Sequence, residues 1–235
     1  MVDLESISIE QDNNSAVIKV KSYPPLHHFY HIYCGNNYVE QEGAWISPVT
    51  LHIEALKSSG LLNYINTVQI GLVGLHHQRD QAKQLLLDSG INHVIVVEAE
   101  SGWEQVTQVP LYNFAQTNNG YVLYAHTKGS FNNTDQNIGW CKLMTDATVV
   151  NWRNCLEKLE HVDAVGRDWH DFSQQHGPHL GGPHVGQKWF AGTFWWAKLK
   201  RIKDIGHIPT MHTRWDAEVW IGQIPDITVH NITEW

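Results

Sequence analysis

Residues 121–129 read Tyr-Val-Leu-Tyr-Ala-His-Thr-Lys-Gly. The first five are apolar or aromatic, as in a buried strand, and the last four are polar residues closed by a glycine. In α/β sheets, ligands bind beyond the carboxyl ends of the strands. The stretch therefore predicts a strand over 121–125 whose end places His126, Thr127, Lys128 and Gly129 in a ligand site.

Three further strand candidates precede this one, at 28–34, 67–73 and 93–97, and helix signals separate them. Short apolar strands that alternate with helices are typical of a mostly parallel central sheet flanked by helices. We therefore expect an α/β, Rossmann-like domain over residues 26–235, with a less regular C-terminal half. Residues 1–25 alternate apolar and polar positions around a turn, which predicts an N-terminal appendage with a β-hairpin.

Several local signals refine this pattern. Residues 101–104 fit a capping box, and Pro110 either opens or restarts a helix that runs to Gln116. Apolar spacing predicts a helix over 149–159, and the aromatic run at 190–197 predicts one continuous strand.

Composition narrows the classes of function. The formal net charge of -8 argues against a non-specific grip on nucleic acid. The three cysteines, at 34, 141 and 155, show no metal or disulfide spacing, which predicts a reducing, cytoplasmic setting. No secretory signal and no apolar run of membrane-spanning length occur in the sequence, so we expect no membrane span.

The aromatic run contains a second candidate wall of the site. Gly192 permits a close backbone approach to a ligand, and Thr193 follows it. Strand alternation sends Trp195 and Trp196 to opposite faces of the sheet. One indole would then pack in the core while the other lines the pocket and stacks on a sugar or base, unless both are packed inside.

A charged helix supplies the candidate base. Arg214 and Glu218 are four residues apart and share a helix face, either as a surface ion pair or as part of the site. We favour Glu218 as a general base for a hydroxyl group, with Asp216 as the second choice.

Other polar residues leave alternatives open. Cys34 and Gly35 end the first strand and lie where a ligand would bind. Arg153, on a helix, meets phosphate, braces the pocket or forms a structural ion pair. The stretch 167–188 is either a polar loop or lid or a metal site, and its histidines are His170, His176, His179 and His184.

Four ordered motifs carry a resemblance to a known family: His126–Gly129, Trp152-Arg153, Phe190–Ala197 and Arg214–Ile221. Over roughly residues 28–222 the chain resembles a group of small bacterial and viral glycosyltransferase-like proteins, which are themselves similar to the GT-A glycosyltransferases. The resemblance implies a GT-A-like fold, whose less regular C-terminal half holds the acceptor, and a nucleotide-sugar donor.

The resemblance also implies roles for the candidate residues. The strand ends at Cys34, Gly35 and His126–Gly129, with Arg153, would bind the donor and its diphosphate. The wall for the sugar or acceptor would consist of Gly192, Thr193, Trp195, Trp196 and Arg214. The acceptor would be a glycan or a modified nucleobase, and the negative net charge favours the glycan.

One departure from the family pattern stands out. GT-A enzymes usually carry an Asp-x-Asp that binds a divalent metal and the diphosphate, and no Asp-x-Asp occurs in this chain. Because His126-x-Lys128 stands at the expected place, either Lys128 supplies the positive charge or His126 remains a ligand for Mn²⁺ or Mg²⁺. The missing motif also leaves two alternatives to a transferase, a non-catalytic nucleotide or carbohydrate binder on the same fold and, less favoured, a hydrolase with zinc in the histidine-rich loop.

Overall fold

The computed structural model describes residues 7–12, 15–20, 22–35, 42–128, 130, 134–172, 186–210 and 212–233, with side chains from residue 22 onward. A seven-stranded sheet lies at its centre, in the order β11-β7-β10-β6-β3-β4-β5. The strands are β3 (Leu26–Tyr33), β4 (Ile65–Val73), β5 (His93–Ala99), β6 (Tyr121–His126), β7 (Ala164–Arg167), β10 (Trp195–Lys198) and β11 (Val229–Ile232).

The sheet is parallel except for one strand. β3 pairs in parallel with β4 and β6, β4 with β5, and β7 with β11, whereas β10 runs antiparallel to both of its neighbours. The first four strands in the chain lie in the order β5-β4-β3-β6, which is the 3-2-1-4 order of a Rossmann-like half. The predicted α/β class with a mostly parallel sheet is confirmed.

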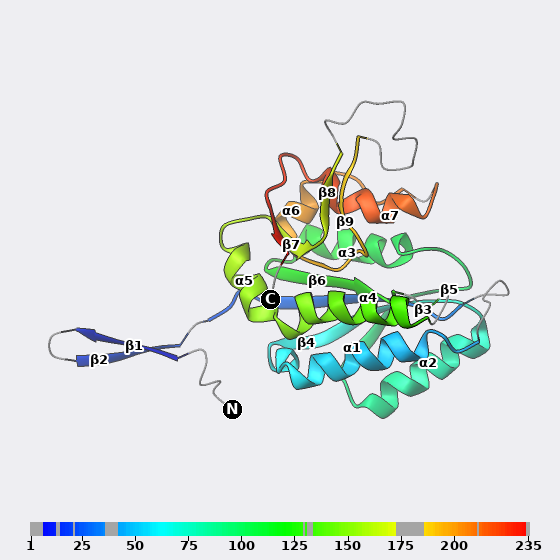
Figure 1. The fold of residues 1–235 in the computed structure, drawn as a ribbon, viewed down its shortest axis with the longest axis horizontal. Coiled ribbons are helices and arrows are strands. Elements are labelled where there is room, and N and C mark those ends of the chain that lie inside the picture. The colour runs from blue at the N-terminus through cyan, green and yellow to red at the C-terminus, as the bar shows by residue number, and fades with distance from the viewer. Residues whose placement is uncertain are drawn as a thin grey trace.

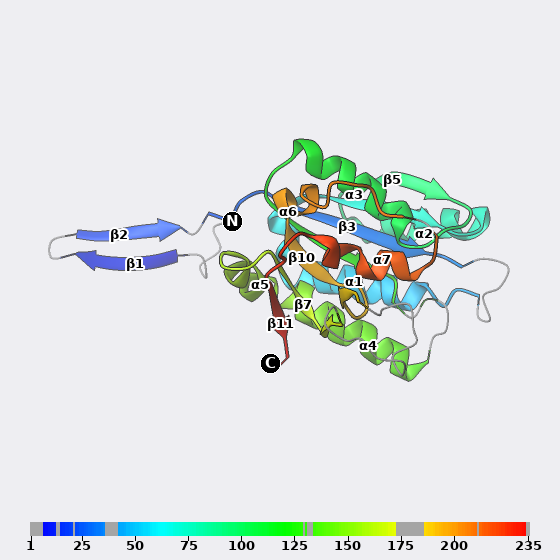
Figure 2. The same cartoon turned by 90° about the horizontal axis from the view of Figure 1, so that it is seen from above.

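Helices cover both faces of this sheet (Figure 1). One face packs against α1 (Ile46–Ser58), α2 (His76–Ser89), α4 (Asp135–Thr145) and α5 (Trp152–Leu159). The other face packs against α3 (Gln105–Thr117), α6 (Leu199–Lys203) and the segment that contains α7 (Trp215–Val219), as Figure 2 shows from above. Two apolar clusters, one on each face, therefore form the core.

Short elements complete the chain. Two strands pair only with each other at the N-terminus, and a second two-stranded ribbon follows β7. These elements are β1 (Ile7–Asp12), β2 (Ser15–Val20), β8 (Trp169–Asp171) and β9 (Lys188–Phe190), with 3₁₀ turns η2 (Leu61–Asn63) and η4 (Trp220–Gln223) and a π-helical turn η3 (Asp146–Val150). The predicted N-terminal β-hairpin thus forms from β1 and β2.

Two local predictions were wrong, and a third was correct only in part. The strand expected over 190–197 is broken into β9 and β10, because Gly192 and Thr193 adopt φ angles of 84° and 55° that no strand contains. The capping box expected at 101–104 does not form, since α3 begins at Gln105 without a side-chain cap, and the helix continues through Pro110 instead of opening or restarting there. The helix expected over 149–159 begins as η3 and becomes α5 only at Trp152.

A pair of histidines is buried between β3 and α1. His28 Nδ1 donates to the Leu123 carbonyl oxygen at 3.1 Å, so its Nε2 accepts the bond from His52 Nε2, 2.8 Å away. The His52 ring also stacks on Tyr30, with the ring centroids 4.1 Å apart. Because burial disfavours the charged ring, it lowers the pKa of His28 to about 4 and that of His52 well below 6.5. The pair is therefore neutral at physiological pH.

Within the described ranges, no helix has both the length and the apolar character needed to cross a membrane.

Candidate active site at the carboxyl edge of the sheet

The site lies between β3 and β6, where the order of the strands reverses. β4 and β5 extend the sheet on one side of β3, whereas the chain returns through α3 and adds β6 on the other side. Open α/β sheets bind ligands in the crevice at such a switch point. Thr127 joins the two strand ends, because its N–H donates to the His31 oxygen at 3.0 Å and its Oγ1 accepts from the Tyr33 N–H at 2.9 Å. Its hydroxyl thus closes this edge of the sheet.

His126 connects three elements across this edge. Its Nδ1 lies 3.0 Å from Oε1 of Glu104, which immediately precedes α3, and its Nε2 lies 2.8 Å from the Gly192 carbonyl oxygen before β10. A carbonyl oxygen can only accept, so Nε2 carries a proton. His126 therefore fixes the turn at 191–193 against the end of β6.

The Glu104 carboxyl group is ionised in this arrangement. Desolvation by burial favours its neutral form, but the hydrogen bond from His126 and the charges of His126 and His31 outweigh it and hold the pKa of Glu104 at about 2. Both ring nitrogens of His126 are thus engaged, Nδ1 with the ionised Glu104 and Nε2 with the Gly192 oxygen. Neither nitrogen then presents a lone pair to a metal ion.

Neighbouring His31, near the end of β3, is neutral. Burial lowers its pKa to about 4, and the charge of Glu104 opposes this only in part. Its Nδ1 lies 2.8 Å from the hydroxyl of Thr107 on α3, which orients the ring.

Lys128 brings a cation to the centre of the edge. Its Nζ lies 4.2 Å from the ring centroid of Trp140 on α4. Desolvation by burial is the main reason that the pKa of Lys128 is lowered; the charges of Glu218 and Glu104 oppose the shift, and Arg214 adds to it. The ammonium group therefore lies within electrostatic range of the carboxylates of α7 and of the α3 N-terminus.

Two amides of α3 hold the α7 segment in place. Gln105 Nε2 donates to the Thr213 oxygen at 2.7 Å, and Gln108 Nε2 donates to the Ala217 oxygen at 3.0 Å. The Glu218 residue is only 9% exposed, and one of its oxygens lies 3.8 Å from Nη2 of Arg214. The charges of Glu218 and Arg214 thus act on Lys128 at this edge, although they belong to a segment far from it in the sequence.

Asp216 forms hydrogen bonds within its own turn. Its Oδ2 accepts from the N–H groups of His212 and Thr213 at 2.9 and 2.8 Å. Although desolvation would raise it, these bonds lower the pKa of Asp216. Asp216 therefore fixes the turn that begins α7, whereas Glu218 is the carboxylate that lies near Lys128.

Cys34 and Gly35 lie at the same edge, as predicted for the end of the first strand, but they face inward. Cys34 is fully buried, and burial raises the pKa of its thiol to about 12. The Gly35 oxygen accepts from the Leu75 N–H at 3.1 Å. All three cysteines are free and buried, so the Cys34 thiol offers a ligand no contact in this conformation.

The aromatic wall expected at Trp195 and Trp196 is absent. The two indoles do face opposite sides of the sheet, but both are 0% exposed. Trp195 stacks on Tyr124, and Trp196 Nε1 donates to the Thr148 oxygen at 2.8 Å. Both rings are core residues because β10 is an interior strand covered by helices on both faces, which the sequence alone did not reveal.

The turn before β10 is closely tied to the site. Gly192 supplies the oxygen that His126 binds, and a Cβ at this position would lie 3.4 Å from Met144 of α4. Thr193 is a non-glycine residue with a positive φ, and its buried Oγ1 has no hydrogen-bond partner within the described residues. Strain and an unpaired hydroxyl of this kind cluster at functional sites.

Arg153 is not part of this group. Its guanidinium lies over Trp152, whose Nε1 donates to the Ser59 oxygen at the end of α1. Because α1 runs from the carboxyl edge to the amino edge of the sheet, Arg153 lies at the opposite edge from Lys128.

Parts of the expected site lie outside the described residues. These are Gly129 and the histidines at 176, 179 and 184. His170 is described, and its ring stacks on Trp189 with the centroids 5.0 Å apart. Across the described segments, no group of three or more His, Cys, Asp or Glu side chains is placed to hold a metal ion.

Sequence reasoning missed Glu104 and Trp140. Glu104 was interpreted as part of a capping box, yet it follows the carboxyl end of β5, so the rule that selected His126 could have selected it as well. Trp140 gives no such signal, because it lies on α4, and only the packing of that helix beside Lys128 brings its ring into the site.

The fold and this edge define a class, a Rossmann-like α/β protein with a charged site at its topological switch point. More specifically, the chain belongs to the family described as Domain of unknown function (DUF8361), whose model matches residues 29–182.

Among curated proteins no match is found. A similar solved structure is 4-diphosphocytidyl-2C-methyl-D-erythritolsynthase from Anaerococcus prevotii DSM 20548. It is 11% identical, with 88% of this chain and 87% of that chain covered and a TM-score of 0.47.

Proposed function

We propose that this chain is a glycosyltransferase that moves a sugar from a nucleotide-sugar donor to a hydroxyl acceptor. The single observation that supports the proposal is that the charge of Glu218 acts on Lys128, which follows β6 at the switch point of the sheet. A cation beside the diphosphate and a carboxylate beside the acceptor hydroxyl are the two charges that such a transfer needs.

In the proposed reaction, the acceptor oxygen forms a bond to the anomeric carbon of the sugar while the bond from that carbon to the diphosphate breaks. The bonding electrons leave with the nucleoside diphosphate, and Lys128 stabilises the charge that develops there. Glu218 accepts the proton of the acceptor hydroxyl. The Glu104–His126 pair holds the 191–193 turn in position.

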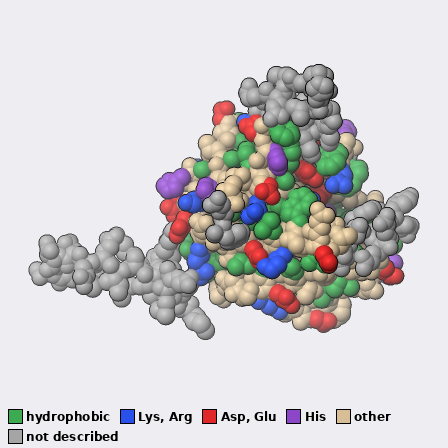
Figure 3. Space-filling view, in the orientation of Figure 1, with side chains coloured by type: hydrophobic (Ala, Val, Ile, Leu, Met, Phe, Trp, Pro, Cys, Tyr) green, Lys and Arg blue, Asp and Glu red, His purple; other side chains and the backbone are tan. Residues whose placement is uncertain are grey.

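The acceptor is proposed to be a glycan in preference to DNA. The net charge of -8 opposes binding to a polyanion, and the face seen in Figure 3 mixes acidic and basic side chains without a continuous basic stripe.

The burial of Glu218 favours a second candidate, a binder that holds a nucleotide sugar without transferring it. A carboxylate that is only 9% exposed and lies close to Arg214 reaches an acceptor only after local rearrangement. Both candidates bind the nucleotide sugar at the same edge of the sheet, but only the transferase turns it over.

The test is the release of nucleoside diphosphate from a panel of nucleotide sugars, with and without glycan acceptors. For a transferase, Glu218→Gln should lower turnover by about 10² to 10⁴, and Lys128→Met by about 10² to 10³. Lys142→Met is the matched control, because Lys142 is an exposed lysine of α4 that pairs with Asp146. Tight binding of a donor by the wild-type protein, with no release under any condition, would replace the transferase by the binder.

A further inference from the structure

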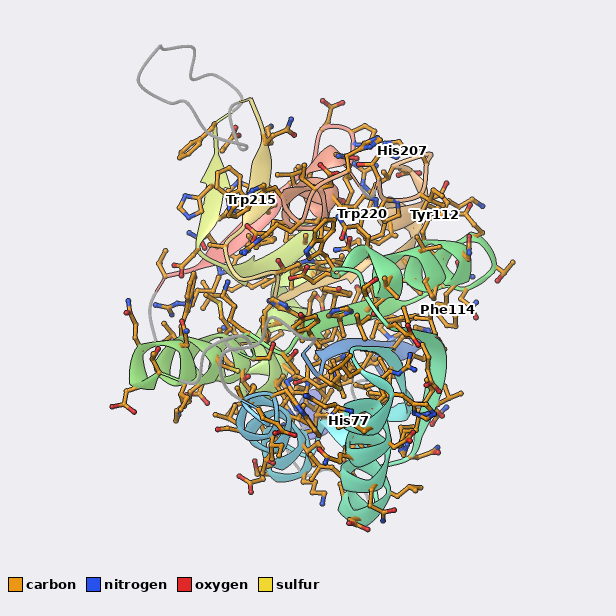
Figure 4. All side chains as sticks on the ribbon, turned by 90° about the vertical axis from the view of Figure 1, so that its right-hand side faces the viewer. His77, Tyr112, Phe114, His207, Trp215 and Trp220 are labelled. Atoms are coloured by element: carbon orange, nitrogen blue, oxygen red, sulfur yellow. The ribbon has the colours of Figure 1, made fainter. Side chains whose placement is uncertain are left out.

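Two cations at the proposed diphosphate site are each supported by an indole ring. Lys128 Nζ lies 4.2 Å from the centroid of the Trp140 ring, and Arg214 Cζ lies 4.4 Å from that of Trp215. Trp215, labelled in Figure 4, belongs to α7, whereas Trp140 belongs to α4 on the other side of the sheet. An aromatic face attracts a cation without neutralising its charge, so both groups retain a full positive charge for a ligand.

The two cations also lie within electrostatic range of each other. Arg214 is one of the groups that lower the pKa of Lys128, so its positive charge acts on the ammonium. Glu218 counters both of them from a side chain that is 12% exposed, whereas the Arg214 side chain is 57% exposed. Like charges held together around one carboxylate cost free energy, which an anionic ligand would offset.

A divalent metal does not fit the donor atoms at this edge. The resemblance to GT-A glycosyltransferases implies such a metal, but His126 gives both nitrogens to Glu104 and Gly192. Throughout the described ranges, His, Cys, Asp and Glu side chains form no group of three that could ligate one. The positions around the expected diphosphate carry two cations in place of paired carboxylates.

We propose that Lys128 and Arg214 together hold the diphosphate of the donor and supply the two positive charges that a divalent metal supplies elsewhere. This inference rests on the proposed function, since it assumes that a nucleotide sugar binds here. It assigns Arg214 to the diphosphate, as a partner of Lys128, and it makes binding independent of metal. The guanidinium plane gives the bidentate contact to phosphate oxygens that the Lys128 ammonium cannot give.

The experiment measures the affinity of ADP, CDP, GDP and UDP, and of the matching monophosphates, by titration calorimetry in excess EDTA. Wild-type protein should bind one diphosphate in EDTA and prefer it to the monophosphate. Arg214→Met and Lys128→Met should each weaken diphosphate binding about 10- to 100-fold and reduce that preference. Lys142→Met on α4 should leave both affinities unchanged.

The Arg214→Lys variant distinguishes the loss of a positive charge from a loss of folding. It keeps a cation at an exposed position, so it should recover part of the affinity that Arg214→Met loses while all variants melt at similar temperatures. The inference is overturned if Arg214→Met binds the diphosphate as tightly as wild type, or if EDTA abolishes binding and Mn²⁺ restores it. If wild type binds none of the nucleotides with or without Mn²⁺, the proposed function itself is wrong, and this inference falls with it.

Discussion

The protein should lose stability steeply between pH 7.5 and pH 5, because histidines that are neutral in its core become charged on unfolding. Burial lowers the pKa of His28 and of His31 to about 4 from 6.5. The neutral form is favoured in the folded state, so this stability is present above pH 6.5 and is lost as the pH falls towards 4. At pH 5 each ring lowers the free energy of unfolding by about 2 kcal/mol, so the two together lower it by about 4 kcal/mol.

His52 adds to this loss in the same direction, since its Nδ1 is buried without a hydrogen-bond partner within the described residues and burial lowers its pKa as well. A loss of about 4 kcal/mol is a large part of the 5–15 kcal/mol that stabilises a typical domain. The measurement is urea unfolding at pH 7.5 and at pH 5, followed by tryptophan fluorescence and circular dichroism.

A variant isolates one ring. His31→Gln keeps a polar group near Thr107 and removes one titrating group, so the pH-dependent loss should fall by about 2 kcal/mol. His207→Gln, at an exposed position labelled in Figure 4, should leave the loss unchanged. Two results would refute the assignment of neutral buried histidines. The free energy of unfolding of the wild-type protein could fall by less than about 1 kcal/mol from pH 7.5 to pH 5, or it could fall equally in His31→Gln and in wild type.

Three further predictions concern the site and its support. Glu104→Gln should destabilise the protein by about 1–3 kcal/mol at pH 7, because it removes the carboxylate that lies 3.0 Å from the buried Nδ1 of His126; urea unfolding checks this, and an unchanged midpoint would contradict the contact. Gly71→Ala should cost about 1–3 kcal/mol, since its Cβ would lie 1.7 Å from the Thr107 hydroxyl oxygen; thermal melting measures the loss, and an unchanged melting temperature would mean that α3 gives way. Gly139→Ala should instead stabilise α4 by about 1 kcal/mol, because nothing lies within 4 Å of the added methyl group; a lower melting temperature would contradict this.

Local sequence patterns were sufficient to predict the first four strands of the sheet and the residues at the end of β6. The run at 121–125 forms β6, and the same rule placed the first three strands. His126 and Lys128 could be located at the carboxyl edge because apolar strands that alternate with helices imply parallel neighbours, whose ends meet at one edge. Their proposed chemical roles remain predictions.

Local patterns were not sufficient wherever a role depends on which layer covers a strand. Trp195 and Trp196 alternate as predicted, but alternation does not say that β10 lies inside the sheet with helices on both faces. Arg153 has the side chain that phosphate prefers, yet the direction of α1 places it at the wrong edge. Glu104 and His126 are 22 positions apart, and only the return of the chain through α3 brings them together.

The position of β10 has a consequence for the order in which the chain assembles. β3 to β6 are consecutive along the sequence, so they can pair as the first half of the chain emerges. β7 and β11 join that group only through β10, whose Trp195 lies between Tyr124 and Gly166. Closing this contact requires a loop of about 70 residues, which slows folding. Until then β6 remains an open apolar edge, so the late arrival of β10 both completes the site and removes a surface prone to aggregation.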